Sequence, residues 1–299
     1  MASTPLECDI YHAYNALQEC HLVLDYSGVL CLPGSQKAST PPESLEDPDS
    51  YDSGVLFGVE DASAVSALCS QLLVRWPSLS GRLRLLPRSA VPAFQLAFPF
   101  LFSAPAASVP EGASAVPVFE GPFPSCIGPG VFLGSAWHAS QPACLARCRF
   151  SALVNCMDNP GGCPLPVAAA LSLTCHRYPW VDEPSFCLLQ DLPRVVGAIE
   201  ASRCAPGGVL LHCYMGASRS AAAAAAWLLW REGGEVEQVH ARLQAARSIV
   251  GINEGFLQQL RQWKAAVAAA GGCGVPLGSI DAAALAATFS GQQKTGNRQ

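Results

Sequence analysis

Residues 209–231 read VLLHCYMGASRSAAAAAAWLLWR and join an apolar run, a short loop and an alanine-rich segment. The apolar run Val209 to His212 is typical of a buried β-strand. The alanines that follow Ser220 predict a helix, because alanine has the highest helix propensity. Gly216 gives the loop between them a backbone that can turn tightly. Strand, tight loop and helix in this order predict an α/β fold built on a mainly parallel sheet.

Residues 213–219, here called the cysteine loop, have the composition of a phosphate-binding site. Successive backbone N–H groups can turn inward as a nest for an anion, and the following helix adds its own N–H groups and dipole. Arg219 adds a planar fork suited to two oxygens of a phosphoryl group. Five residues separate it from Cys213, whose thiol pKa we expect below the usual value of about 8.5. The pattern predicts a thiolate that attacks phosphorus and forms a phosphocysteine, with the Ser220 hydroxyl stabilising the thiolate as it leaves.

The run His212 to Ser220 resembles the signature loop of dual-specificity protein phosphatases, His-Cys-x-x-Gly-x-Ser-Arg-Ser, at every fixed position. Such a match arises by chance in about one chain in 10⁵ or rarer. The resemblance implies that the backbone of the whole run surrounds the phosphate. The members of this run besides Cys213, Arg219 and Ser220 are His212, Tyr214, Met215, Gly216, Ala217 and Ser218. A buried core cysteine beside an ion-paired arginine is the structural alternative.

Expelling a tyrosine or serine oxygen requires a proton donor, because an unprotonated alkoxide is a poor leaving group. The resemblance implies an aspartate about thirty residues before the cysteine, and Asp182 lies 31 positions before Cys213. We expect Asp182 to act as the acid and then to deprotonate the water of the second step; a solvated loop carboxylate is the alternative. Glu183 is the weaker candidate, and Asp191 is expected to cap the next helix. His212 is either a core imidazole or a hydrogen-bonding neighbour of Cys213.

The resemblance extends over residues 126–266 and implies a sheet with helices on its faces. Its strands are expected at 131–134, 152–155, 171–178 and 209–212, and its helices at 140–148, 188–201, 217–231, 236–246 and 255–270. A closing segment that packs under the cysteine loop is implied by Arg247, Asn253, Gly255-Phe256 and Gln259-Leu260. Ile252 stands where the family usually has proline.

Two breaks in composition divide the chain. Residues 33–53 are rich in Pro, Ser, Asp and Glu and predict an exposed loop, and residues 103–122 are rich in Ala, Pro and Ser and predict an interdomain linker. The chain is therefore expected to hold a first domain at 1–102, a linker at 103–122, a phosphatase domain at 123–270 and a flexible tail at 271–299.

The first domain weakly resembles a degenerate rhodanese-like domain of the kind found in MAP kinase phosphatases and in serine/threonine/tyrosine-interacting-like proteins. Its expected elements are a helix at 10–20, strands at 29–32, 55–59 and 83–86, and a helix at 64–76. An active rhodanese needs a cysteine where Glu60-Asp61-Ala62-Ser63 stand, so sulfur transfer is not expected. Arg82, Arg84 and Arg88 are the candidate docking cluster for a MAP kinase; a solvated strand edge is the alternative.

Composition and charge exclude other classes. The formal net charge of −5 argues against a nucleic-acid surface, and the ten-residue apolar run Ala221 to Trp230 is shorter than the roughly 20 residues of a membrane span. Residues 1–10 show no secretory signal. The fourteen cysteines lack finger-like spacing, so we expect reduced thiols, no metal and no cofactor, in the cytoplasm, with nucleus and mitochondrion as alternatives. 

Three hypotheses for the function remain from the sequence. The first is a phosphatase acting on phosphotyrosine, with phosphoserine and phosphothreonine as further substrates, in phosphorylated proteins. The second is a weakly active or non-catalytic phosphoprotein-binding regulator, because relatives with this two-domain layout have lost the cysteine. The third is a phosphatase for phosphoinositides, RNA 5′-ends or glycans. Such enzymes tend to carry basic residues inside the loop, and Tyr214, Met215 and Ala217 supply none.

Overall fold

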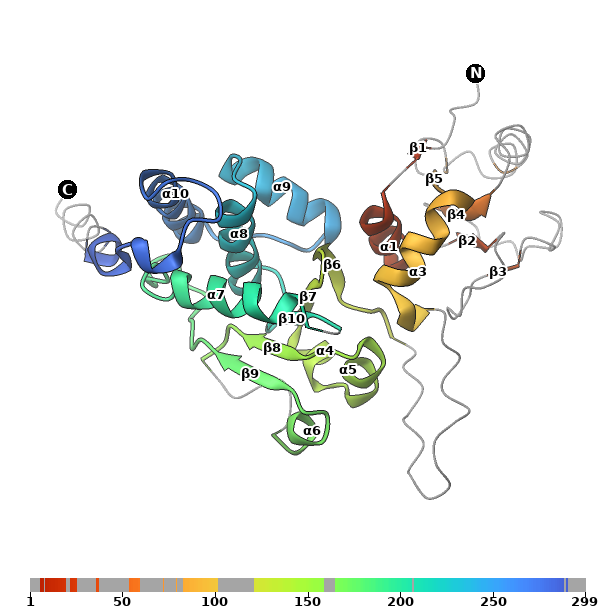
Figure 1. Cartoon of the computed structure of the whole chain (residues 1–299), viewed down its shortest axis with the longest axis horizontal. Helices are drawn as coiled ribbons and strands as arrows, with labels where there is room; N and C mark the ends of the chain where they lie inside the picture. The colour runs from red at the N-terminus through yellow and green to blue at the C-terminus, as the bar shows by residue number, and fades with distance from the viewer. Residues whose placement is uncertain are drawn as a thin grey trace. The chain divides into compact units, whose positions relative to one another are not determined.

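The computed structural model describes residues 6–7, 9–19, 22–25, 36–37, 54–59, 72, 79, 83–101, 121–158, 165–205, 207–287 and 289 (Figure 1). The chain divides into two compact units, Met1–Pro122 and Phe123–Gln299, which we describe separately. The expectations for 29–32, most of 33–53 and of 64–76, most of the linker and the last ten residues lie outside the described residues.

The first unit contains a five-stranded sheet in the order β1-β5-β4-β2-β3, in which neighbouring strands run parallel. Its strands are β1 Leu6–Glu7, β2 Leu22–Asp25, β3 Gln36–Lys37, β4 Gly54–Val59 and β5 Leu83–Pro87. Helix α1 (Ile10–Glu19) contacts β4 and β5, and α3 (Val91–Ala97) follows β5. The Tyr14 ring stacks on the Phe98 ring, with centroids 4.3 Å apart, so aromatic packing joins α1 to the end of α3.

The second unit contains a five-stranded sheet in the order β6-β7-β10-β8-β9, with β10 at its centre. Only β6 runs antiparallel to its neighbour. The strands are β6 Ser125–Gly128, β7 Val131–Ser135, β8 Ala152–Asn155, β9 Thr174–Arg177 and β10 Val209–Cys213. The helices are α4 Ala136–Ser140, α5 Pro142–Cys148, α6 Leu165–Ala170, α7 Leu192–Arg203, α8 Arg219–Arg231, α9 Val236–Ala246 and α10 Glu254–Ala269. The mainly parallel α/β fold is confirmed.

Proline explains where the helices depart from the prediction. The single helix expected at 140–148 is two helices, α4 and α5, joined at Gln141. Pro142 disfavours helical backbone at the residue before it, and Gln141 is extended with ψ at 102°. Pro142 itself fits the first turn of α5, where its missing N–H needs no partner. Pro193 likewise lies in the first turn of α7, as its second residue, and α7 begins at Leu192 rather than at residue 188.

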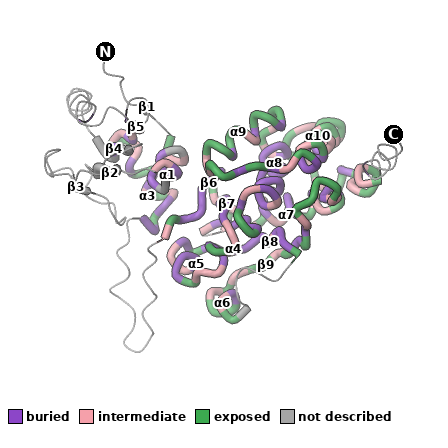
Figure 2. The backbone as a smooth tube through the Cα atoms, turned by 180° about the vertical axis from the view of Figure 1, so that it is seen from behind, coloured by how far each residue is buried: buried purple, intermediate pink, exposed green. Residues whose placement is uncertain are grey.

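Alternate residues of β10 face opposite sides of the sheet, and this periodicity fixes the side on which the cysteine lies. Val209, Leu211 and Cys213 belong to the buried cluster formed with α7, α8, α9 and α10. Helix α8 is buried along its alanine run, residues 221–226, whose small side chains let it lie close to the sheet. Figure 2 shows α8 mostly buried among the other elements of this unit. Cys213 therefore ends the central strand on the face covered by α8.

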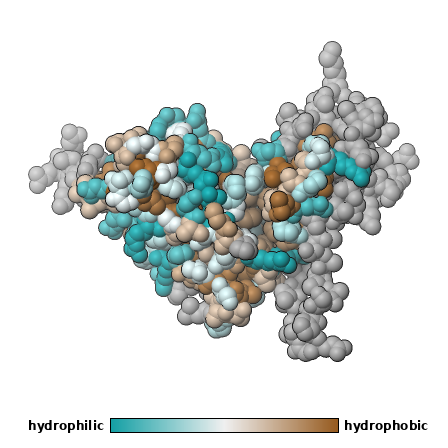
Figure 3. All heavy atoms as spheres, viewed as in Figure 1, coloured by the Kyte–Doolittle hydropathy of each residue, from teal (hydrophilic) through white to brown (hydrophobic). Residues whose placement is uncertain are grey.

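The segment after Gly271, expected to be flexible, packs onto the unit where it is described. Ile280 and Phe289 are buried in the main cluster, and the indole N–H of Trp230 donates to the Val275 carbonyl at 2.8 Å. Figure 3 shows hydrophilic residues interspersed with smaller hydrophobic areas over one face of the unit. Among the described residues, no helix has the length and hydropathy needed to cross a bilayer.

Candidate active site

The backbone of the cysteine loop has its carbonyl groups bound from outside. Four consecutive carbonyl oxygens each accept a hydrogen bond from a group beyond the loop. The pairs are Ala136 N–H to Tyr214 O at 3.1 Å, Arg247 Nη2 to Met215 O at 2.8 Å, Arg247 Nε to Gly216 O at 3.2 Å and Gly251 N–H to Ala217 O at 3.0 Å. Carbonyls that point outward leave the N–H groups of the same loop for its interior, which is the arrangement of an anion nest.

Gly216 is required by this arrangement for two reasons. Its φ of +77° lies in the left-handed region that side-chain-bearing residues rarely adopt. A Cβ atom placed there would lie 2.3 Å from the Gly134 carbonyl oxygen at the end of β7. The loop therefore passes so close to the neighbouring strand that only glycine fits.

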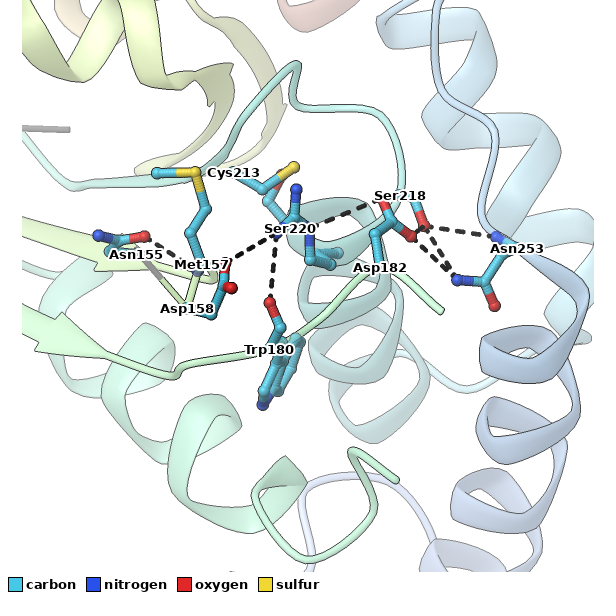
Figure 4. A network of polar contacts seen from close by, with 10 residues as sticks. Asn155, Met157, Asp158, Trp180, Asp182, Cys213, Ser218, Ser220 and Asn253 are labelled. Carbon is cyan, nitrogen blue, oxygen red and sulfur yellow. Dashed lines mark hydrogen bonds and ion pairs between the residues drawn. The ribbon is translucent and has the colours of Figure 1, made fainter. Parts of the chain in front are cut away.

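The Cys213 thiol is buried and surrounded by donors. Its Sγ lies 3.2 Å from the Ser220 hydroxyl, which donates to it (Figure 4). Burial, the largest single effect, raises the pKa of Cys213, but hydrogen bonds from the Ser220 hydroxyl and from the backbone N–H groups of Ser220, Gly216 and Ala217 together lower it below the usual value. A thiol with a lowered pKa supplies more thiolate at neutral pH and is the more reactive for it.

A neighbouring cysteine shows that the donors of the cysteine loop, and not burial in this part of the sheet, lower the thiol pKa of Cys213. Cys156 follows β8, and its N–H donates to the His212 carbonyl at 2.9 Å, which places it beside Cys213 in the sheet. Burial raises the pKa of Cys156 well above its usual value, and the nearby Cys213 raises it further. Cys156 has no such loop around it and is expected to stay an unreactive thiol.

We expect Ser220→Ala to raise the pKa of Cys213. The thiolate fraction, and with it the rate of alkylation by iodoacetamide, increases as pH rises through the thiol pKa. Because that pKa is lowered in the wild-type chain, its alkylation inflection should lie at a lower pH than that of an ordinary cysteine thiol. The variant should show its inflection at higher pH, measured as alkylation of the Cys213 peptide by mass spectrometry. Equal inflections in both proteins would contradict the role of the hydroxyl.

Arg219 begins α8 and is held from three sides. Its Nη1 donates to the Trp180 carbonyl at 3.2 Å and lies 3.8 Å from Asp158 Oδ1. Its Nε lies 3.6 Å from Asp182 Oδ2. The side chain is only 12% exposed. These contacts come from the loops after β8 and β9, so the guanidinium is fixed in the mouth of the cysteine loop before any anion arrives.

Asp182 lies at the same mouth and is bound by two side chains from other elements. Its Oδ1 accepts hydrogen bonds from Ser218 Oγ at 2.6 Å and from Asn253 Nδ2 at 3.0 Å (Figure 4). Asn253 also caps α10, since its Oδ1 accepts from the Phe256 N–H at 2.9 Å. The sequence assigned Asn253 only to the closing segment; its place before an acidic first turn is the pattern of a helix cap. The structure thus brings Asp182, Arg219 and Cys213 to one site.

Asp191 differs from its expected role, and His212 follows the first of its two alternatives, a core imidazole. Asp191 occupies the N-cap position of α7 but makes no capping bond; its Oδ2 instead accepts the indole N–H of Trp180 at 2.9 Å, which secures the loop that carries Asp182. His212 is 1% exposed, and its Nδ1 has no hydrogen-bonding partner among the described residues. Burial first, and then the charge of His138, lowers the pKa of His212 to about 4. His212 is therefore a neutral core imidazole at neutral pH.

Comparison with known proteins identifies the family. Residues 131–266 match the family model described as dual specificity phosphatase, catalytic domain. The human dual specificity phosphatase 28 is 34% identical over 143 residues, which cover 48% of this chain and 78% of the relative. The chain belongs to the dual-specificity phosphatase family. Its activity is accordingly that of a protein phosphatase.

Other members of the dual-specificity phosphatase family match the same part of the chain. Mouse dual specificity phosphatase 28 is 30% identical over 138 residues, which cover 46% of this chain and 82% of the relative. A crystal structure of human DUSP28 is 31% identical and covers 48% of this chain and 98% of that one, with a TM-score of 0.45.

Proposed function

We propose that this chain hydrolyses phosphotyrosine, and phosphoserine or phosphothreonine, in proteins through a phosphocysteine intermediate on Cys213. The observation that carries the proposal is the outward binding of four consecutive loop carbonyls around a thiol whose pKa is lowered. An inward-facing set of N–H groups binds the three charged oxygens of a phosphoryl group, and the thiol lies within reach of its phosphorus.

In the first step, the Cys213 thiolate attacks phosphorus in line with the ester oxygen. A sulfur–phosphorus bond forms as the phosphorus–oxygen bond breaks, and Arg219 binds two of the equatorial oxygens as their charge is redistributed. Asp182 gives its proton to the departing oxygen. The Ser218 and Asn253 side chains hold this carboxyl at the mouth, so its position does not depend on the substrate.

In the second step, water attacks the phosphocysteine. The Asp182 carboxylate takes a proton from this water, and the sulfur leaves as a thiolate while inorganic phosphate forms. The Ser220 hydroxyl, 3.2 Å from the sulfur, donates a hydrogen bond that stabilises the departing thiolate. The alternative of a non-catalytic phosphoprotein-binding regulator is disfavoured, because nucleophile, arginine and acid are all present.

We also propose that residues 1–102 form an interaction domain of the degenerate rhodanese type, joined by a linker at 103–122 to the phosphatase domain. The parallel sheet of the first unit supports this layout. Arg84 is half-buried and Arg88 is exposed, while Arg82 lies outside the described residues, so a MAP kinase partner stays a hypothesis. A cytoplasmic location is supported by the nine described cysteines, all of which are free thiols.

The test of the proposed mechanism is the dependence of Asp182→Ala on the leaving group. On a phosphotyrosine or phosphoserine peptide, the variant should lose about 10²–10⁴-fold in kcat, because the departing oxygen needs a proton. On 4-nitrophenyl phosphate the decrease in the rate of the first step should be far smaller, because nitrophenolate can leave without being protonated. The measurement is kcat for both substrates, with single-turnover rates to isolate the first step.

The matched control for this test is Glu183→Ala, which removes the adjacent exposed carboxylate. Its kcat should equal that of the wild-type chain on both substrates. A large loss in Glu183→Ala, or the same single-turnover loss in Asp182→Ala for both substrates, would show that Asp182 is not the acid.

A further inference from the structure

Four large hydrophobic side chains are exposed in the described part of the second unit, and all four lie in or beside the cysteine loop. The exposed fractions are 45% for Trp137, 69% for Tyr214, 56% for Met215 and 47% for Ile249. We call these residues the apolar rim. Single exposed hydrophobic residues need no explanation, but a group of them around one site marks a surface that a partner covers.

Hydrogen bonds place the first three of these residues together. Tyr214 and Met215 directly follow Cys213 in the loop. Trp137 follows Ala136, whose N–H donates to the Tyr214 carbonyl at 3.1 Å. The start of α4 is therefore attached to the loop at the residue next to the nucleophile, and the half-exposed Trp137 is the next residue of α4.

The fourth member is attached to the other end of the loop. Ile249 lies in the turn after α9, between Arg247 and Gly251. The Arg247 guanidinium donates to the Met215 carbonyl at 2.8 Å, and the Gly251 N–H donates to the Ala217 carbonyl at 3.0 Å. Bonds at both ends of this turn hold the segment that carries Ile249 against the cysteine loop.

The exposed carboxylates around the cysteine loop disfavour acidic residues next to the phosphoresidue of a bound segment. Asp158 is 59% exposed, and Asp182 and Glu183 are exposed on the adjacent loop. The two arginines that contact the loop are already engaged: Arg219 is 12% exposed and faces the carboxylates, and Arg247 binds loop carbonyls. A carboxylate or second phosphate beside the bound phosphoresidue would meet negative charge and apolar surface.

We propose that the apolar rim selects phosphorylated protein segments whose phosphoresidue is flanked by hydrophobic side chains, in preference to polar, acidic or multiply phosphorylated segments. This inference rests on the proposed function, since it takes the cysteine loop as the phosphate site. Half-burying one leucine-sized side chain against the rim corresponds to about tenfold in affinity.

The experiment uses the full chain carrying Cys213→Ser, so that binding is measured without turnover. Three fluorescein-labelled phosphotyrosine peptides differ only in their two residues on each side, which are all leucine, all serine or all glutamate. Fluorescence anisotropy gives their dissociation constants. The leucine-flanked peptide should bind at least about tenfold more tightly than the serine-flanked one, and the glutamate-flanked one should bind most weakly. A ratio near one between the leucine and serine peptides overturns the inference, as does failure of both to bind.

Two variants test whether the apolar rim causes the preference for leucine-flanked over serine-flanked peptides. Trp137→Ser together with Ile249→Ser should reduce the leucine-to-serine ratio to within about threefold. Leu96→Ser, which removes an 85%-exposed leucine in the first unit, is the matched control and should keep the full ratio. An unchanged ratio in the double variant overturns the assignment. Turnover of the same peptides by the wild-type chain is measured separately. If the chain binds leucine-flanked peptides preferentially but does not turn them over, the proposed function is refuted, whereas the inference about the apolar rim is supported.

Discussion

Replacing Cys213 by serine is expected to lower kcat by about 10⁵-fold or more, because the substitution removes the group that forms the covalent intermediate. A serine hydroxyl in the same nest is overwhelmingly protonated at neutral pH, whereas the loop donors lower the thiol pKa of Cys213. The phosphate site itself stays intact, since the surrounding N–H groups belong to the backbone. The measurement is turnover of 4-nitrophenyl phosphate and of a phosphotyrosine peptide.

The matched control for this substitution is Cys204→Ser, which changes an exposed cysteine after α7. It should keep wild-type kcat on both substrates. Binding of a phosphotyrosine peptide should persist in Cys213→Ser, which separates loss of chemistry from loss of folding. Equal turnover by the wild-type chain and Cys213→Ser would overturn the mechanism.

Arg219→Lys is the second substitution with a large expected effect, a loss of about 10²–10³-fold in kcat/KM. Lysine keeps the positive charge but offers a single point donor in place of a planar fork. It also cannot reproduce the simultaneous contacts to the Trp180 carbonyl and the Asp182 carboxylate. Stopped assays over a range of substrate concentrations give kcat and KM separately.

Arg261→Lys is the control for this second substitution. Arg261 is 45% exposed on α10 and pairs with Glu237 and Glu254. Its replacement should leave both kinetic constants within about twofold of wild type, as is usual for exposed ion pairs. If Arg219→Lys also stayed within that range, bidentate binding by this arginine would not contribute to the reaction.

Much of the fold could be predicted from local sequence patterns. The strand at 152–155 and the helix at 236–246 were predicted with their observed ends, because apolar runs and helix-forming residues report directly on local structure. The division of residues 136–148 into two helices was signalled by Pro142 and was missed. The short antiparallel strand Ser125–Gly128 was missed because its residues, Ser-Cys-Ile-Gly, do not form the apolar run that marked Ala152–Asn155.

The local part of the site was predictable from its residues, and the family resemblance added Asp182 and a closing segment with Arg247 and Asn253, but not their individual contacts. The loop around Cys213 is a contiguous motif, and Asp182 followed from a family spacing. The hydrogen bond from Asn253 to Asp182 joins residues 71 positions apart, and Arg247 reaches the loop from 32 positions beyond Met215. Such contacts depend on how α8, α9 and α10 pack against the sheet, which no local pattern encodes. The hydrogen bonds to the outward-facing loop carbonyls could not be predicted from the sequence for the same reason.

The central claim, covalent catalysis at Cys213, is tested most directly by trapping the intermediate. Asp182→Ala protein is mixed with 4-nitrophenyl phosphate and quenched with acid within the first turnover, then digested and analysed by mass spectrometry. Removal of the base should slow hydrolysis of the phosphocysteine, so the intermediate accumulates. The predicted result is one phosphoryl group on the peptide that contains Cys213. Release of nitrophenol with no phosphorylated Cys213, or with the phosphoryl group on another residue, would contradict the account.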